Sequence, residues 1–167
     1  DSDFRNVDVI AQRMRAAGVR TVLLQIGQYP ENVPGDLRAY GFKIALWGSP
    51  SGDDERALRD AQADGYMPQI EGPGEFQAAI TNLEAGVGTG LSLSIVTTLA
   101  GLETFTTSPS GQVTTVEAER LKAAGVTHAW VECYKQGGPS HFPISKMEWS
   151  LKHRGIPHFN PLIGLYW

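Results

Sequence analysis

The chain has 167 residues, of which 41% are hydrophobic and 19% charged, with a net charge of −4. This length suffices for one domain with a hydrophobic core, and the composition is that of a folded protein. The negative charge offers no basic surface for nucleic acid, and no run of about 18 apolar residues forms a membrane span. We therefore expect neither nucleic acid nor a membrane as a partner.

The elements predicted along the chain follow one repeated pattern, a helix that ends at a glycine and leads into an apolar strand. The segments 12–27 (QRMRAAGVRTVLLQIG) and 119–134 (ERLKAAGVTHAWVECY) share a basic helix end, Ala-Ala-Gly-Val and a strand. A glycine suits the left-handed residue after a helix, and basic residues suit the negative helix end. Weaker copies cover residues 37–48, 58–72 and 151–166, each with a helix that ends at its glycine.

The pattern predicts alternating helices and strands. The predicted helices span residues 6–17, 34–40, 53–64, 74–85, 114–124 and 143–154, and the strands 21–26, 43–48, 66–71, 91–97, 127–133 and 158–165. Alternation with continuous apolar strands indicates an α/β fold with a parallel sheet, either doubly wound or a (β/α) barrel. Polar or aromatic residues at the strand ends favour the TIM-barrel-like form, because barrels build their sites there.

The chain is shorter than a complete eight-stranded barrel. A full eight-stranded barrel usually takes about 250 residues. We therefore expect residues 1–167 to form a single (β/α)-barrel-like domain of about six strands, incomplete here and part of a longer chain.

Two glutamates end predicted strands. In the repeat alignment Glu132 corresponds to Gln25, and Glu71 ends its strand in the same way. Two carboxylates facing one cleft are the groups that glycoside hydrolysis requires, one as acid and one as nucleophile or base. The alternative is that both are solvated strand ends paired with basic residues.

Amides and aromatic rings accompany the glutamates. Gln25 and Gln69 are placed to hold substrate hydroxyls, while Trp47, Tyr134 and Tyr166 are placed to stack on sugar rings. The alternative for the aromatic residues is ordinary packing between strand ends and loops.

Other features indicate structure. GVGTG (86–90) precedes a strand and opens no helix, so it fails as a dinucleotide motif. Residues 53–55 form the acidic first turn of a helix that Ser51 or Asp53 caps. The single cysteine, Cys133, excludes an internal disulfide, and the four histidines lack metal-site spacing. We expect no metal and no cofactor.

Two stretches carry a resemblance to a known family. Residues 65–80 (GYMPQIEGPGEFQAAI) and 128–167, with the QIEG and VECY strand ends and the final Pro-x-Ile-Gly-x-Tyr strand, resemble the glycoside-hydrolase-like TIM-barrel domain of minor tail proteins from phages of actinobacteria. The likeness covers about residues 60–167. It implies a virion-associated barrel near the tail tip, with host cell-wall glycans and other virion proteins as partners. Whether the chain forms a homo-oligomer stays open.

The chain also departs from glycosidase patterns. It is similar to lysozyme-type barrels with an Asp-x-Glu strand, but that place reads Gln69-Ile70-Glu71. The Asn-Glu pair of another glycosidase clan is absent as well. The resemblance therefore leaves three alternatives open: an enzyme with Glu71 and Glu132 as catalytic residues, an inactive carbohydrate-binding barrel, and a purely structural virion component.

Overall fold

The computed structural model describes residues 6–70, 73–98, 115–132, 148, 152 and 156–162. The helices within these ranges are α1 (Val7–Ala16), α2 (Val33–Ala39), α3 (Asp54–Asp60), α4 (Pro73–Glu84) and α6 (Thr115–Ala123). The strands are β1 (Thr21–Gln25), β2 (Lys43–Gly48), β3 (Gly65–Ile70), β4 (Ser92–Thr98), β5 (His128–Glu132) and β6 (His158–Leu162). The helix predicted at 143–154 lies almost entirely outside the described residues.

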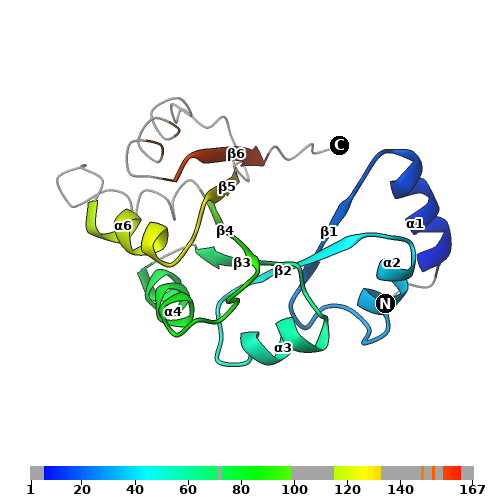
Figure 1. The fold of residues 1–167 in the computed structure, drawn as a ribbon, viewed down its shortest axis with the longest axis horizontal. Coiled ribbons are helices and arrows are strands. Elements are labelled where there is room, and N and C mark those ends of the chain that lie inside the picture. Colours follow the sequence, from blue (N-terminus) through cyan, green and yellow to red (C-terminus); the bar gives the residue numbers. More distant parts are fainter. Residues whose placement is uncertain are drawn as a thin grey trace, which may run out of the picture.

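The strands form one six-stranded sheet in the order β1-β2-β3-β4-β5-β6, and every neighbouring pair is parallel. The order follows the chain without a reversal point, as in a barrel and unlike a doubly wound sheet. The sheet is curved, and the helices lie on its outer, convex side (Figure 1). The predicted parallel, TIM-barrel-like fold is therefore confirmed, with β1 and β6 as the outer strands of the described sheet.

The repeated glycines take the predicted role at the helix ends. Gly18 has a φ of 81° and Gly125 a φ of 92°, both in the left-handed region. The N–H of Val19 donates to the carbonyl of Met14, five residues earlier, at 3.0 Å, and in the second copy the N–H of Val126 donates to the carbonyl of Leu121, also at 3.0 Å. This Schellman geometry satisfies helix carbonyls and turns the chain toward the next strand.

The end of α3 differs from the expectation that a glycine closes each helix. Gln62 takes the left-handed position, with a φ of 48°, and the guanidinium of Arg38 donates to its carbonyl. Gly65 is instead the first residue of β3, where an added Cβ would lie 3.1 Å from the Cβ of Ala45. That glycine permits close contact between strands, so the prediction for this repeat was wrong.

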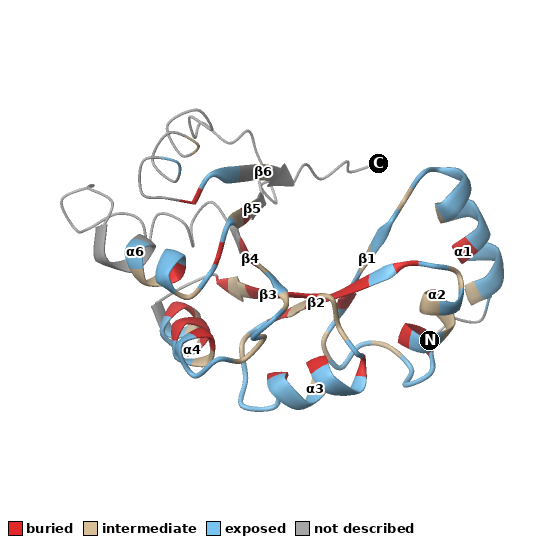
Figure 2. Ribbon diagram, viewed as in Figure 1, coloured by how far each residue is buried: buried red, intermediate tan, exposed pale blue. Residues whose placement is uncertain are grey.

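Two apolar clusters lie on opposite sides of the sheet. The larger one fills the space between sheet and helices, and Figure 2 shows the buried sides of α3, α4 and α6 turned toward the strands. The smaller one consists of Ala45, Met67 and Val96, with Trp47 and Trp130 packed against it. Because side chains alternate along a strand, this second cluster lies on the concave side.

The glycine-rich segment between α4 and β4 serves packing. Gly88 has a φ of 82°, and an added Cβ would lie 3.1 Å from Leu93 Cδ2 and 3.4 Å from Tyr66 Cδ1. Gly90 has nearly the same φ, 83°, but nothing within 4 Å of such a Cβ. The first glycine is therefore required for space as well as for backbone conformation.

These two glycines form a matched pair. We expect Gly88→Ala to lower the free energy of unfolding by about 2–5 kcal/mol, because left-handed strain of about 1–2 kcal/mol adds to overpacking of about 1–3 kcal/mol. Gly90→Ala should lower the free energy of unfolding by the left-handed strain alone. Urea unfolding of both variants measures the difference, and equal losses would contradict a packing role for Gly88.

Candidate functional site

The residues before the two predicted catalytic glutamates lie in one row of the sheet. Ile70 pairs with Thr97 on β4, and Thr97 pairs with Val131 on β5. Glu132 is the last residue of β5 and continues the ladder opposite neighbouring residues of β4 and β6. Glu71 follows Ile70 and lies outside the described residues, as do Tyr134, Tyr166 and Cys133. Their predicted roles stay predictions.

Three other predicted site residues are described. Gln25 is exposed at the end of β1, where it pairs with the half-buried Trp47 of β2. Gln69 is half-buried and pairs with Val96, a member of the concave cluster. The structure thus brings Gln25 beside Trp47. Gln25 and Glu132 lie on β1 and β5, about 19 Å apart along the sheet at about 4.8 Å per strand, so they are not neighbours within the sheet.

Sequence reasoning did not name two residues of the concave side as site residues. Trp130 is half-buried and packs against the concave cluster. Asn160 pairs with it on β6, and its buried Nδ2 has no hydrogen-bond partner among the described residues. Counting back two residues from Glu132 would have identified Trp130, because positions two apart share a face.

Two histidines stack at the amino-terminal end of the last two strands. The rings of His128 and His158 are 4.3 Å apart between centroids and 23° from parallel. Thr127 Oγ1 lies 2.8 Å from His128 Nδ1. Burial, and secondarily the neighbouring His158, lowers the pKa of His128. The pair therefore favours the uncharged form of His128.

A buried carboxylate fixes the loop that follows β2. Asp54 is fully buried, and its Oδ1 accepts bonds from the N–H and Oγ of Ser51 at 3.2 and 2.7 Å. Its Oδ2 accepts from the hydroxyl of Tyr66, and Asn82 Nδ2 lies 3.5 Å away. Burial and the bond to Asp54 raise the pKa of Tyr66, so the phenol stays a donor.

The expected acidic first turn is present, with Asp53 at the N-cap position and Asp54 and Glu55 in the first turn of α3, but the side-chain capping differs from the expectation. Asp53 makes no side-chain cap bond, and Ser51 Oγ instead accepts from the N–H of Asp53 at 3.3 Å. Nothing in the sequence distinguishes the buried Asp54 from its exposed neighbours. The signal lies in its partners on β3 and α4, which only the fold brings near.

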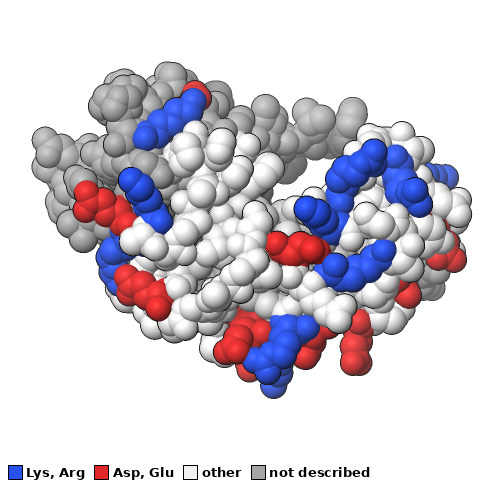
Figure 3. Space-filling model, viewed as in Figure 1, with Lys and Arg blue, Asp and Glu red and all other residues white. Residues whose placement is uncertain are grey.

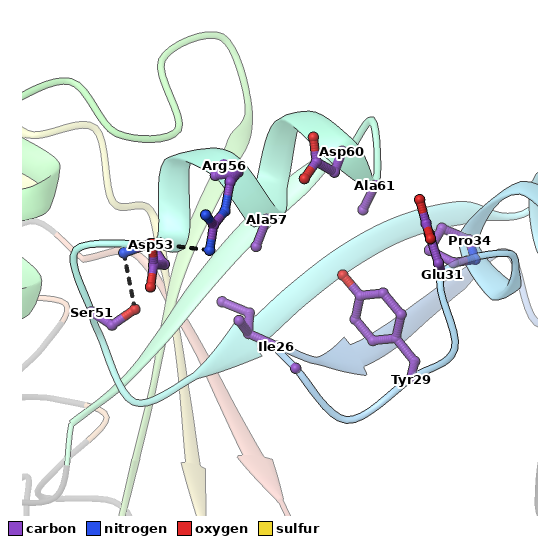
Figure 4. A pocket seen from close by; sticks show the side chains of 11 residues that line it. Ile26, Tyr29, Glu31, Pro34, Ser51, Asp53, Arg56, Ala57, Asp60 and Ala61 are labelled. Atoms are coloured by element: carbon purple, nitrogen blue, oxygen red, sulfur yellow. Dashed lines mark hydrogen bonds and ion pairs between the residues drawn. The ribbon is translucent and has the colours of Figure 1, made fainter.

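A groove with a volume of about 580 Å³ lies elsewhere among the described residues. It runs beside α3 and is bordered by the loops after β1 and β2 (Figure 4). None of the predicted site residues lines it. The predicted residues Trp47, Gln25 and Gln69 belong to the concave side of the sheet instead.

Two further findings concern the described residues as a group. No three His, Cys, Asp or Glu side chains in the described ranges come together as a metal site requires. None of the helices in the described part of the chain has the length and apolarity needed to cross a membrane.

Comparison with known proteins gives no family. No protein-family model matches the chain, and no curated protein matches it. Among solved structures it is similar to hydroxymethylglutaryl-CoA lyase from Pseudomonas aeruginosa, at 11% identity and a TM-score of 0.47, over 75% of this chain and 47% of that one. It is also similar to HMG-CoA lyase from Brucella melitensis, at 13% identity and a TM-score of 0.45, over 78% of this chain and 60% of that one. The class, a parallel TIM-barrel-like α/β domain, follows from strand order and pairing.

The buried network predicts a cost for removing one hydroxyl. Tyr66→Phe leaves the buried Asp54 carboxylate short of a donor, which should lower the free energy of unfolding by about 1–3 kcal/mol. The control is Tyr40→Phe, which removes a 2.9 Å bond to the exposed Asp8 and should change stability little. Chemical denaturation measures both, and an unchanged Tyr66→Phe variant would contradict the structural role.

The histidine stack predicts a change in titration. His158→Asn should raise the pKa of His128 part of the way toward its ordinary value, because burial, the larger cause, remains. A lowered folded pKa means that stability falls as pH drops from about 6.5 through that pKa, and this fall should shrink in the variant. NMR titration of the imidazole gives the pKa; no upward shift would argue against the stack.

Proposed function

We propose that this chain is a glycoside-hydrolase-like barrel that acts on host cell-wall glycans as part of a phage tail. Glu71 serves as general acid and Glu132 as base or nucleophile. Gln25 and Gln69 hold substrate hydroxyls, and Trp47 stacks on a sugar ring. Tyr134 and Tyr166 extend the same cleft.

The observation that supports the proposal is the register at the carboxyl ends of β3 and β5. Ile70 and Val131, the residues before the two glutamates, pair with the same residue of β4. If the pairing continues by one residue, the backbones of Glu71 and Glu132 lie about 10 Å apart, two strand spacings along the sheet.

In this proposal the side chain of Glu132 faces the concave side, because side chains alternate along a strand. Trp130 lies in the concave cluster, and a residue two positions further along a strand is expected on the same face. Side chains on the inside of a curved sheet converge. Carboxyl groups that start from backbones about 10 Å apart then fall within the roughly 6.5–9.5 Å of an inverting mechanism.

The chemistry follows from that spacing. The carboxylic acid of Glu71 protonates the glycosidic oxygen as the bond to the anomeric carbon breaks. The carboxylate of Glu132 accepts a proton from a water that attacks the opposite face of the sugar. At about 5 Å the second carboxylate would instead attack the sugar directly, with retention.

A binding module without turnover is the second candidate, favoured by the two tryptophans. Trp47 and Trp130 are both half-buried against the same three-residue cluster on the concave side. Aromatic faces bind the apolar faces of sugar rings without any carboxylate. Such a module would keep glycan affinity when both glutamates are replaced.

The test uses the 167-residue chain on actinobacterial cell-wall polysaccharide. We expect release of reducing ends, and a fall of at least about 100-fold in turnover for Glu71→Gln and for Glu132→Gln, because general acid–base catalysis contributes about that much. Glu55→Gln, on the exposed side of α3, is the control and should leave turnover unchanged.

Binding is measured in parallel. If the chain binds glycan without turnover, and Glu71→Gln and Glu132→Gln leave that affinity unchanged, the enzyme proposal is wrong and the binding-module proposal stands. Absence of both activities would leave a structural virion component. Circular dichroism of each variant establishes that the fold is intact.

A further inference from the structure

The groove beside α3 is a second candidate site, separate from the concave side. Its volume of about 580 Å³ lies within the usual range of ligand pockets, about 300–1,000 Å³. Its apolar lining includes Ile26, Pro34, Ala57 and Ala61. All lie on β1, α2, α3 or the residues beside them, so the groove is built within the described part of the chain.

The charges that line this groove are unbalanced. Glu31, Asp53 and Asp60 contribute three carboxylates, and Arg56 is the one cation among the lining residues. Arg56 is already bound to Asp53, with Nη2 3.1 Å from Oδ1. Neither Glu31 nor Asp60 has an ion pair with any residue in the described ranges. Two negative charges at one end of the groove are therefore left without a counter-charge.

An aromatic ring lies at the same end. Figure 4 shows the hydroxyl of Tyr29 pointing toward α3, with Glu31 and Asp60 on that side of the groove. Tyr29 is half-buried, and burial together with the charge of Asp60 raises its pKa. The ring is thus a neutral phenol beside two carboxylates. A flat cation can stack on such a ring while its N–H groups reach the carboxylates.

We propose that this groove binds an arginine side chain presented by a partner polypeptide. The guanidinium stacks on Tyr29 and pairs with Asp60 and Glu31, and apolar side chains next to the arginine lie along Ile26 and Ala57. Arginine suits the site better than lysine, because its planar fork combines stacking with paired hydrogen bonds.

The basic residues of α3 are held in ion pairs with neighbouring carboxylates. Figure 3 shows acidic and basic side chains side by side over α3, at the lower edge of that view. Arg56 pairs with Asp53 and Arg59 with Glu55, so Asp60 is the exposed carboxylate of α3 that has no ion pair among the described residues and is open to an incoming cation. This site does not depend on the glutamates of the concave side, so each proposal can fail without the other.

The experiment measures binding of two blocked pentapeptides, Leu-Ala-Arg-Ala-Leu and Leu-Ala-Gln-Ala-Leu, by NMR shift titration of the whole chain. The arginine peptide should bind at least about 10-fold more tightly and move the Tyr29 resonances. Asp60→Asn combined with Glu31→Gln should weaken it at least about 10-fold, and Tyr29→Leu by a smaller factor. Glu119→Gln, an exposed carboxylate on α6, removes one charge outside the groove and should change nothing.

Three results would overturn the proposal. The first is equal affinity for the two peptides. The second is n-propylguanidine binding as tightly as the arginine peptide, which would make the ligand a free cation. The third is self-association of the chain that the Asp60→Asn and Glu31→Gln pair abolishes, which would make a second copy the occupant; sedimentation measures this.

Discussion

Parallel pairing in sequential order is the constraint on which the other features depend. The strands β1 to β5 each follow a helix that ends in a left-handed turn, as at Gly18 and Gly125, and the ladder then fixes their register. Because side chains alternate, the register decides which residues face the helices and which face the concave side. A shift of the register by one residue would turn Trp130 to the helix side of the sheet and remove its contact with the concave cluster.

Most of the fold could be predicted from the sequence because its signals are local. The period of the apolar residues and the glycine after each helix are local signals, and they located every described element within a few residues. The left-handed Gln62 at the end of α3 and the burial of Asp54 could not be predicted, because both depend on groups that are distant in the sequence. The guanidinium of Arg38 donates a hydrogen bond to the carbonyl of the left-handed Gln62, and the hydroxyl of Tyr66 donates one to the carboxylate of the buried Asp54. Neither interaction leaves a mark in the neighbouring sequence.

The candidate site was predicted less completely, for a different reason. Strand ends could be counted, so Gln25 and Trp47 were correctly placed at neighbouring ends. The face that a side chain takes could not be predicted where a strand is apolar throughout, so the position of Trp130 on the concave side became clear only from the structure. The groove beside α3 left no sequence motif, because its lining residues come from two separate segments, 26–34 and 51–61.

The Asp54 network has a consequence for how the chain opens. In a sheet of sequential units each unit contacts mainly its neighbours, so local opening of one unit is expected to be independent of units further away. Asp54 and Ser51 belong to the loop and helix after β2, Tyr66 to β3 and Asn82 to α4. Fluctuations of these three segments are thereby joined, and their amide protons should exchange with solvent as one cooperative block.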